Sequence, residues 1–320
     1  MKKHIFFKLI RKLRKQKTYT EKFISLRDQE ANDFIYVTIK EAIRNKSGLM
    51  ISKFGTIELN CINCYIQNKY NTRIQNFRNS TCGIYELYID DAVNNLCKHA
   101  GFFPNDVNII NKYVDLTVSD AKQIDILGSY LEGEAFVEPY LSLQCKRVNL
   151  NGYYAPFLWK NPWSELLKGQ RVLVIHPFAD TISSQYNNNR DKLFSDPKVL
   201  PEFKSLQIIP AVQSMAGEQT SFKSWFDALD YMEKEIDKCE FDIAIIGCGA
   251  YGMNLAAYIK RKGKIAIHLA GWTQMLFGIY GKRWTEDQPE FKKYINNFWT
   301  KPSSTEKPKN ADSIEGGCYW

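Results

Sequence analysis

One stretch, Phe241 to Gly271, limits the folds open to this chain more than any other. It begins with a continuous apolar run too short for a buried helix and then reaches the glycine-rich segment Gly247 to Gly252. An apolar-periodic segment follows as far as Lys262, and a second apolar run covers Ile265 to Leu269. This order predicts a strand, a glycine turn, a helix and a second strand.

Gly247, Gly249 and Gly252 have the spacing G-x-G-x-x-G, which is typical of dinucleotide-binding turns. Glycines let a backbone approach an anion closely, and the N–H groups that open the helix add a positive dipole end. The second strand runs through His268 to Gly271 without the acid that binds the ribose of NAD. We therefore expect a mononucleotide rather than NAD. A glycine turn that only lets helix and strand pack is the alternative.

Strand candidates also occur at Arg171 to His176 and at Leu206 to Val212, and helical segments separate them. This alternation predicts an α/β fold, a Rossmann-like doubly wound and mostly parallel sheet with right-handed crossovers. We expect one α/β domain over residues 21 to 300, with a helical insertion at about 84 to 131. The nucleotide-binding part is expected at about 165 to 285.

Two polar residues lie at or just beyond the end of the strand candidate Arg171 to His176. Side chains at the carboxyl ends of parallel strands face the ligand crevice, so His176 and Asp180 are candidate catalytic residues. The alternative for His176 is a hydrogen bond to the backbone at the strand end. The pair Lys282 and Arg283 follows an apolar loop and has the chemistry to clamp a diphosphate, or else forms part of the charged surface.

The net charge of +8 comes from one end of the chain. Residues 1 to 17 contain eight Lys and Arg and no acid, whereas the rest of the chain has 35 basic and 35 acidic residues. The balanced body argues against a nucleic-acid partner. Apolar residues on one helical face of this arm predict docking of residues 2 to 17 on an anionic membrane surface, and a solvated basic terminus is the alternative. The expected location is cytoplasmic or peripheral at the inner face of the cell membrane.

The chain has eight cysteines and no good secretory signal, which predicts reduced thiols. Cys61 and Cys64 form the only CxxC, and without a second CxxC we interpret them as small residues on one helix face. The tail from residue 301 is polar and expected to be mobile, but it ends on Tyr319 and Trp320. Two aromatic residues at the end of a polar tail predict that this end docks on the body.

Two separated segments together resemble a known family. Ser52 to Leu59 resembles the strand-turn-helix segment with the Asp-x-Glu signature in GT-D type glycosyltransferases. Asp242 to Gly271 resembles the C-terminal half of these enzymes, and the likeness in arrangement covers most of residues 45 to 275. The chain also resembles uncharacterised bacterial proteins of surface-polysaccharide gene clusters.

The resemblance implies a glycosyltransferase that moves a sugar from a nucleoside-diphosphate sugar to a glycan or lipid-linked acceptor. Glu58 matches the family's Glu and is the first candidate for the catalytic base, ahead of Asp180 and His176. Thr56 stands where the family has Asp, so the Mg or Mn ion that the resemblance implies would be left with Glu58 alone, and metal dependence stays open. The expected substrate contacts are Lys53, Phe54, Gly55, Thr56, Glu138, Tyr140, Gly247, Gly249, Tyr251, Gly252, Gly271, Gln274 and Arg283.

Two other functions fit parts of the sequence. A non-catalytic nucleotide-binding or assembly module would use the glycine turn without chemistry. A Rossmann-type oxidoreductase is favoured by the glycine spacing and opposed by the missing ribose acid.

Overall fold

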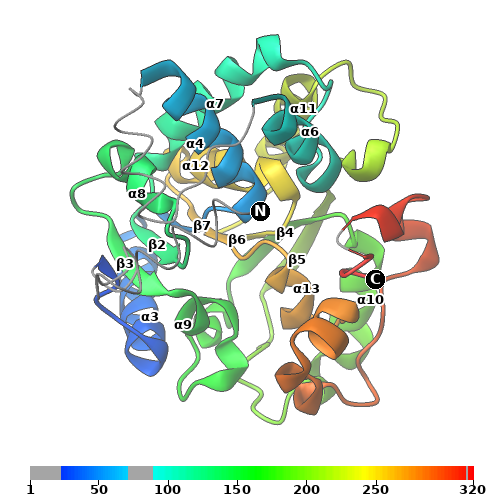
Figure 1. Ribbon diagram of the computed structural model, residues 1–320. Coiled ribbons are helices and arrows are strands. Elements are labelled where there is room, and N and C mark those ends of the chain that lie inside the picture. The colour runs from blue at the N-terminus through cyan, green and yellow to red at the C-terminus, as the bar shows by residue number, and fades with distance from the viewer. Residues whose placement is uncertain (1–22, 71–88, 315) are drawn as a thin grey trace, which may run out of the picture.

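The computed structural model describes residues 23–70, 89–314 and 316–320, so the basic arm lies outside the described residues. Seven parallel strands form one sheet in the order β3-β2-β1-β7-β6-β4-β5 (Figure 1). The fold is therefore the expected doubly wound, Rossmann-like α/β architecture. The strands are β1 (Leu49–Ser52), β2 (Ile126–Ser129), β3 (Lys146–Asn149), β4 (Arg171–His176), β5 (Ser205–Pro210), β6 (Ile243–Ile246) and β7 (Ile265–His268).

Helices cover both faces of this sheet. One face packs against α4 (Thr56–Tyr70), α6 (Ile89–Ala100), α7 (Ile110–Ala121), α11 (Trp225–Asp237) and α12 (Gly252–Arg261). The other packs against α3 (Asp28–Asn45), α9 (Leu150–Tyr154), α10 (Ala179–Asn189) and α13 (Trp272–Leu276). A short helix, α8 (Glu134–Val137), follows β2.

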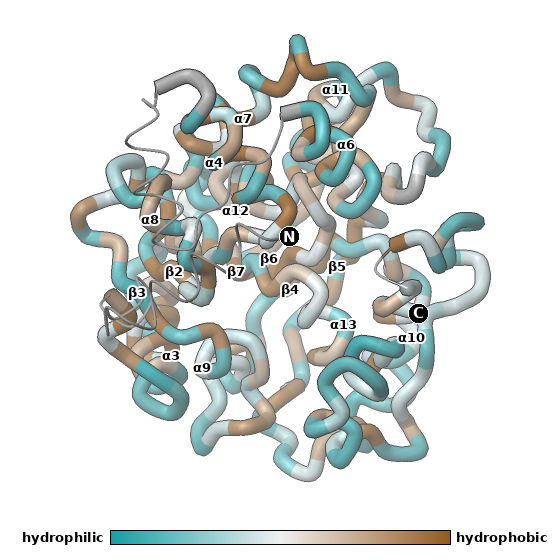
Figure 2. Tube along the Cα trace, in the orientation of Figure 1, coloured by the Kyte–Doolittle hydropathy of each residue, from teal (hydrophilic) through white to brown (hydrophobic). Residues whose placement is uncertain are grey.

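The strands are apolar on both sides because both faces are covered. Along β4, Leu173 and Ile175 enter the core on the α12 side, while Val172 and Val174 enter the opposite core. All four side chains are fully buried. In Figure 2, hydrophobic residues recur along the central strands, for example near the labels of β6 and β4. Because helices cover both faces, the sheet lies at the centre of the molecule, and a ligand can approach it at the ends of the strands.

The strand order reverses in the middle of the sheet. β1 pairs with both β2 and β7, with Met50 opposite Ala266 and Ile51 opposite Ile126. The chain leaves β4 for the edge strand β5 but leaves β6 for β7 in the opposite direction, so the connections diverge between the neighbouring strands β4 and β6. In an open parallel sheet, ligands bind outside the carboxyl ends of strands near such a reversal. The fold thus directs attention to the loops that follow β1, β7, β6 and β4.

The structure adds strands that the sequence pattern did not predict. β2 lies inside the stretch of about 84 to 131 that was expected to be mostly helical, and β3 lies in a stretch for which no strand was predicted. Each has only four residues, which is too short for a period to be detected, and β2 contains Gly128. No helix among the described residues is long and apolar enough to cross a membrane.

The CxxC pair predicted to lie on one helix face belongs to α4. Cys61 and Cys64 are buried on this helix, at 0% and 4% exposure, and pack in the core beside α6. Burial raises the pKa of the Cys61 thiol. Both are therefore small core residues, as their spacing predicted.

Candidate functional site

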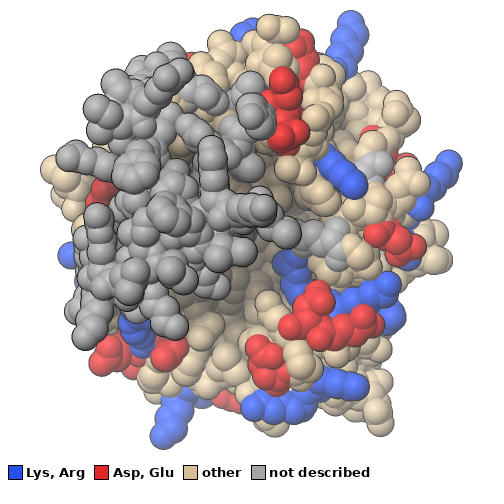
Figure 3. Space-filling view, in the orientation of Figure 1, with Lys and Arg blue, Asp and Glu red and all other residues tan. Residues whose placement is uncertain are grey.

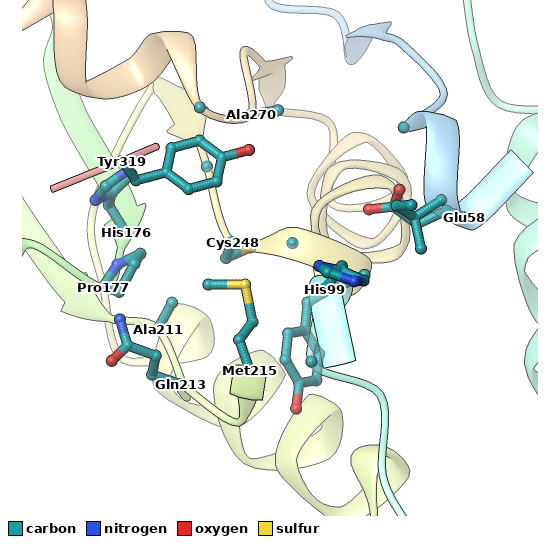
Figure 4. Close-up of a pocket in the computed structure, with 18 of the residues that line it drawn as sticks. Glu58, His99, His176, Pro177, Ala211, Gln213, Met215, Cys248, Ala270 and Tyr319 are labelled. Atoms are coloured by element: carbon teal, nitrogen blue, oxygen red, sulfur yellow. The ribbon is translucent and has the colours of Figure 1, made fainter. Parts of the chain in front are cut away.

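A pocket opens at the carboxyl edge of the sheet, where the strand order reverses. Its walls come from the loops after β1, β2, β4, β5, β6 and β7, and its volume is about 170 Å³. Figure 4 shows His176 and Tyr319 toward one end, Glu58 and His99 toward the other, and Cys248 between them. Loops from six strands thus converge on one concave site, which is the usual place for a ligand in this fold.

Most of the sequence-predicted site residues lie in this pocket. Those that line it are Glu58, His176, Lys53, Gly55, Thr56, Gly247, Gly249, Tyr251, Gly271, Gln274 and Arg283. Phe54 is buried in the core and contacts only a small cavity behind the pocket. Gly252 begins α12 behind the glycine turn and does not line the pocket.

Three other predicted residues lie elsewhere. Glu138 forms an ion pair with Arg147, which neutralises it away from the pocket. Tyr140 packs, half-buried, against the core on the α12 side. Asp180 stands exposed in the first turn of α10, in a separate hollow. The strand end that carries Asp180 was recognised correctly, but the helix begins so soon after β4 that its side chain faces away from the pocket lining.

Glu58 lies in the first turn of α4, directly after β1. A carboxylate there is favoured by the helix dipole. Its Oε2 atom lies over Gly55, only 1.9 Å from where a Cβ would stand. Glycine at position 55 therefore gives the carboxylate room to fold back over the turn. Glu58 is the one acidic side chain among the described residues that line the pocket.

Lys53 places a buried cation at the end of β1. Its side chain is buried, lines the pocket and forms no ion pair with a described residue. The Nζ atom lies 5.9 Å from the ring centre of Tyr130. Burial lowers the pKa of Lys53, but Tyr130, Tyr154 and Glu58 together raise it by more, so the pKa lies above its usual value. The pocket thus holds a positive charge at neutral pH that no carboxylate neutralises directly.

Tyr130 is held in the pocket wall by the loop after β2. Its hydroxyl lies 3.3 Å from the Thr56 hydroxyl. Glu134 fixes this loop, because its Oε1 accepts hydrogen bonds of 3.0 Å from the N–H groups of both Tyr130 and Leu131. Thr56 therefore pairs with a tyrosine on the neighbouring loop.

His176, the last residue of β4, is buried and neutral. Its Nδ1 accepts a 3.0 Å hydrogen bond from the N–H of Phe178. Burial lowers the pKa of His176 to about 3. The proton of the neutral ring must then sit on Nε2, which makes His176 a hydrogen-bond donor. The backbone contact weighed as the alternative for this histidine is present, and the ring also lines the pocket.

A second buried histidine supports the floor of the pocket. His268 ends β7, and its Nδ1 lies 3.0 Å from the Ser52 hydroxyl at the end of β1. Its Nε2 lies 2.2 Å from where a Cβ of Gly252 would stand. Burial, followed by the charge of Lys53, lowers the pKa of His268 to about 3. The neutral ring of His268 therefore packs between the end of β1 and the start of α12.

The glycine turn contributes both packing and free donors. A Cβ added at Gly247 would lie 2.4 Å from the backbone oxygen of Ala270, and one added at Gly249 would lie 2.6 Å from the backbone oxygen of Ala100. Close packing alone therefore requires glycine at both positions. Gly249 also has a positive φ of 58°. Within the described residues, the N–H groups of Cys248 and Gly249 form no hydrogen bond, and both residues line the pocket. Free N–H groups in such a turn suit an anion.

The residues present do not fit a divalent metal ion. Magnesium and manganese prefer several oxygen ligands, including carboxylates. No group of three His, Cys, Asp or Glu that could hold a metal occurs in the part of the chain that the structure describes. Thr56 directs its hydroxyl to Tyr130, which leaves Glu58 alone. We therefore derive no chemical step through a metal.

Two residues of the pocket lining, His99 and Gln213, were not predicted, whereas Gln274 was. The buried atoms His99 Nδ1, Gln213 Nε2 and Gln274 Oε1 have no hydrogen-bond partner among the described residues, and all three side chains line the pocket. An unpaired buried polar atom is costly unless a ligand or water satisfies it. His99 ends a helix and Gln213 follows β5. Only the carboxyl-end position of Gln213 could have signalled its role in the sequence.

The docked C-terminal segment closes one side of the pocket. Tyr319 and Trp320 line it, and Trp320 is only 6% exposed. Gln274 Nε2 donates to the Tyr319 oxygen at 3.2 Å, and the Arg283 guanidinium lies 4.4 Å from the centre of the Tyr319 ring. The expected docking of this segment thus places two aromatic rings in the site itself.

Comparison with protein-family models, with functionally described proteins and with solved structures gives no match.

Proposed function

We propose that this chain is a glycosyltransferase that moves a sugar from a nucleoside-diphosphate sugar to a glycan or lipid-linked acceptor. The observation that carries the proposal is a buried cation, Lys53, which forms no ion pair with a described residue, together with Glu58, the one carboxylate among the described lining residues, in one pocket at the reversal of the strand order. Glycosyl transfer needs a stabilised diphosphate leaving group and a base for the attacking hydroxyl. Lys53 and Glu58 supply these two kinds of group.

The diphosphate would lie against the glycine turn. Lys53 offers an ammonium, the N–H groups of Cys248 and Gly249 form no hydrogen bond to a described residue, and His176 presents an N–H from Nε2. Arg283 lies at the pocket wall beside Tyr319. Cations and aligned donors in a buried site stabilise charge that develops on a leaving phosphate oxygen. This set takes the part that a divalent ion plays in metal-dependent transfer.

Glu58 would act as the base. The acceptor hydroxyl oxygen bonds to the anomeric carbon of the donor sugar, and its proton passes to the Glu58 carboxylate. The bond between the anomeric carbon and the diphosphate oxygen breaks, and the nucleoside diphosphate leaves with that electron pair. Glu58 is partly exposed in the pocket lining, so an acceptor can reach it.

The unpaired polar atoms suit recognition of the rest of the donor. Gln213 offers an amide N–H, Gln274 a carbonyl oxygen and His99 a ring nitrogen. A base edge and sugar hydroxyls present complementary donors and acceptors. The bulky residue Tyr251, stacked on Trp225 at 5.0 Å, forms part of the same wall.

The cellular setting is part of the proposal. The chain would act in bacterial surface-polysaccharide synthesis at the inner face of the membrane, where the basic arm of residues 2 to 17 would hold it near a lipid-linked acceptor. On the face shown in Figure 3, charges of both signs are interspersed over the described residues, as expected for a body that does not bind nucleic acid.

The test is a turnover assay with a panel of nucleoside-diphosphate sugars and a mixture of glycan and lipid-linked acceptors. Release of nucleoside diphosphate with one donor, together with transfer of its sugar, supports the proposal. Binding of a donor without hydrolysis or transfer in any mixture would instead favour a non-catalytic nucleotide-binding module.

A further inference from the structure

A second hollow lies between α10 and the segment Asn297 to Ser303. It has a volume of about 580 Å³ and shares no lining residue with the pocket. α10 begins three residues after His176, so the hollow starts close to the pocket and runs along the helix. In Figure 1 the C-terminal segment lies beside α10. The hollow is thus a separate surface adjacent to the proposed active site.

The α10 wall of this hollow is polar but almost uncharged. Asp180 is the only charged residue in the helix, which otherwise carries a run of Ser, Gln and Asn. Asn189 Nδ2 donates to Gln185 Oε1 at 2.7 Å, and Asn188 Nδ2 donates to the Ser184 hydroxyl at 3.3 Å. These hydrogen bonds along the helix hold amides and hydroxyls in fixed positions.

Three groups in the hollow are open to a ligand. The Asp180 carboxylate and the Asn297 amide are exposed, and neither side chain forms a hydrogen bond to another described residue. The Phe298 ring is large, apolar and 45% exposed, and the Lys192 ammonium lies over one of its faces, 5.4 Å from the ring centre. A carboxylate and an amide can pair with neighbouring sugar hydroxyls, while an aromatic ring can cover the C–H face of a sugar. A bare hydrocarbon ligand would leave the polar groups unpaired.

The opposite wall is fixed in place before any ligand binds. Gln185 Nε2 donates to the Phe298 oxygen at 2.9 Å, and the N–H of Ser303 donates to the Thr181 hydroxyl at 3.0 Å. Glu306 accepts a 2.8 Å hydrogen bond from the N–H of Asp180. A preformed surface loses little entropy when a flexible chain binds to it.

We propose that this hollow binds an oligosaccharide through Asp180, Asn297 and the Phe298 ring. The nine-residue rise from Asp180 to Asn189 spans roughly 14 Å along the helix, enough for about two or three sugar units. The two charged residues among those described that line the hollow, Asp180 and Lys301, have opposite signs, so their charges balance and favour an uncharged saccharide. Its role as the glycan acceptor rests on the proposed transferase function, whereas binding itself does not.

The experiment is saturation-transfer NMR on the full chain with uncharged trisaccharides of glucose, galactose and N-acetylglucosamine, followed by titration of any that bind. Phe298→Ala removes the ring but keeps the backbone oxygen that Gln185 contacts. Tyr231→Ala is the matched control, because Tyr231 is 41% exposed on α11, away from the hollow. Asn297→Ala tests the amide without disturbing a buried group.

We expect at least one trisaccharide to bind with a dissociation constant of about 1 mM or tighter, and Phe298→Ala to weaken it roughly tenfold. Tyr231→Ala should bind as wild type does. Absence of binding by the whole panel would overturn the proposal, as would full binding by both Phe298→Ala and Asn297→Ala. Turnover of a nucleotide sugar without binding of any trisaccharide would refute oligosaccharide binding in the hollow but would leave the proposed transferase function standing. Binding of a trisaccharide without binding of any nucleotide would support the oligosaccharide site and refute the transferase function.

Discussion

The Nδ1 atom of His176 accepts a 3.0 Å hydrogen bond from the backbone N–H of Phe178, two residues along the chain. This contact fixes the proton of the neutral ring on Nε2. His176, a candidate catalytic base in the sequence, therefore presents a hydrogen-bond donor at Nε2. The consequences reach both stability and ligand binding.

The first prediction concerns acid stability. Burial lowers the pKa of His176 to about 3, below the ordinary value of 6.5, so the unfolded chain binds the proton more readily. The stabilisation is complete above pH 6.5 and is lost as the pH falls from there toward 3. This histidine should contribute a slope of up to about 1.4 kcal/mol per pH unit to the free energy of unfolding.

His176→Asn keeps an acceptor for the Phe178 N–H and removes the titration. Denaturant unfolding of wild type and variant between about pH 7 and pH 4.5 should therefore show a shallower slope in the variant. Equal slopes would mean that His176 is protonated in the folded chain.

The second prediction concerns the base. Glu58→Gln preserves the shape of the side chain but removes the carboxylate, so turnover should fall by roughly 10²- to 10⁴-fold while the melting temperature stays near that of wild type. Glu290→Gln is the control, since Glu290 is exposed and outside the pocket. Near-wild-type transfer by Glu58→Gln would remove this residue from the mechanism.

The third prediction concerns the buried cation. Lys53→Met fills a similar volume without charge, and binding of a nucleoside diphosphate should weaken roughly 10- to 100-fold. Binding of the matching nucleoside, which has no phosphate, should change little. Calorimetric titration of both ligands measures this difference. An equal loss for nucleoside and diphosphate would show that Lys53 shapes the pocket rather than binding the anion.

The fourth prediction concerns packing behind the glycine turn. Gly252→Ala would bring a methyl group to 2.2 Å from His268 Nε2, so the variant should lose about 1 to 3 kcal/mol of stability. In a His268→Ala background the same substitution should cost clearly less, because the colliding ring is gone. Denaturant unfolding of the four proteins measures the coupling. Additive costs would contradict the contact.

The sequence predicted the architecture because its signals were long and repeated. The glycine turn, the helix α12 and the strands on either side lie where the pattern indicated. The pattern did not predict β2 or β3, because four residues are too few for a period to appear.

The site was only partly predictable, for physical reasons. His176 could be placed because it ends a strand and the carboxyl ends of parallel strands meet at one edge, whereas Lys53 and Glu58 were predicted from the family resemblance. His99 and Tyr319 enter the pocket from distant elements, and only tertiary packing brings them there. Glu138 was predicted in the site, but its charge is met by Arg147 outside the pocket, a pairing that no local pattern encodes.

The measurement that tests the central claim most directly is a thermal-shift panel of nucleoside diphosphates, diphosphate sugars and NAD(P), run on wild type and Lys53→Met, with and without manganese. A ligand that binds the folded chain raises its melting temperature in proportion to the free energy of binding. We predict a shift for one diphosphate sugar that does not depend on manganese and is largely lost in Lys53→Met. A shift with NAD(P) alone, or none with any nucleotide, would contradict the account.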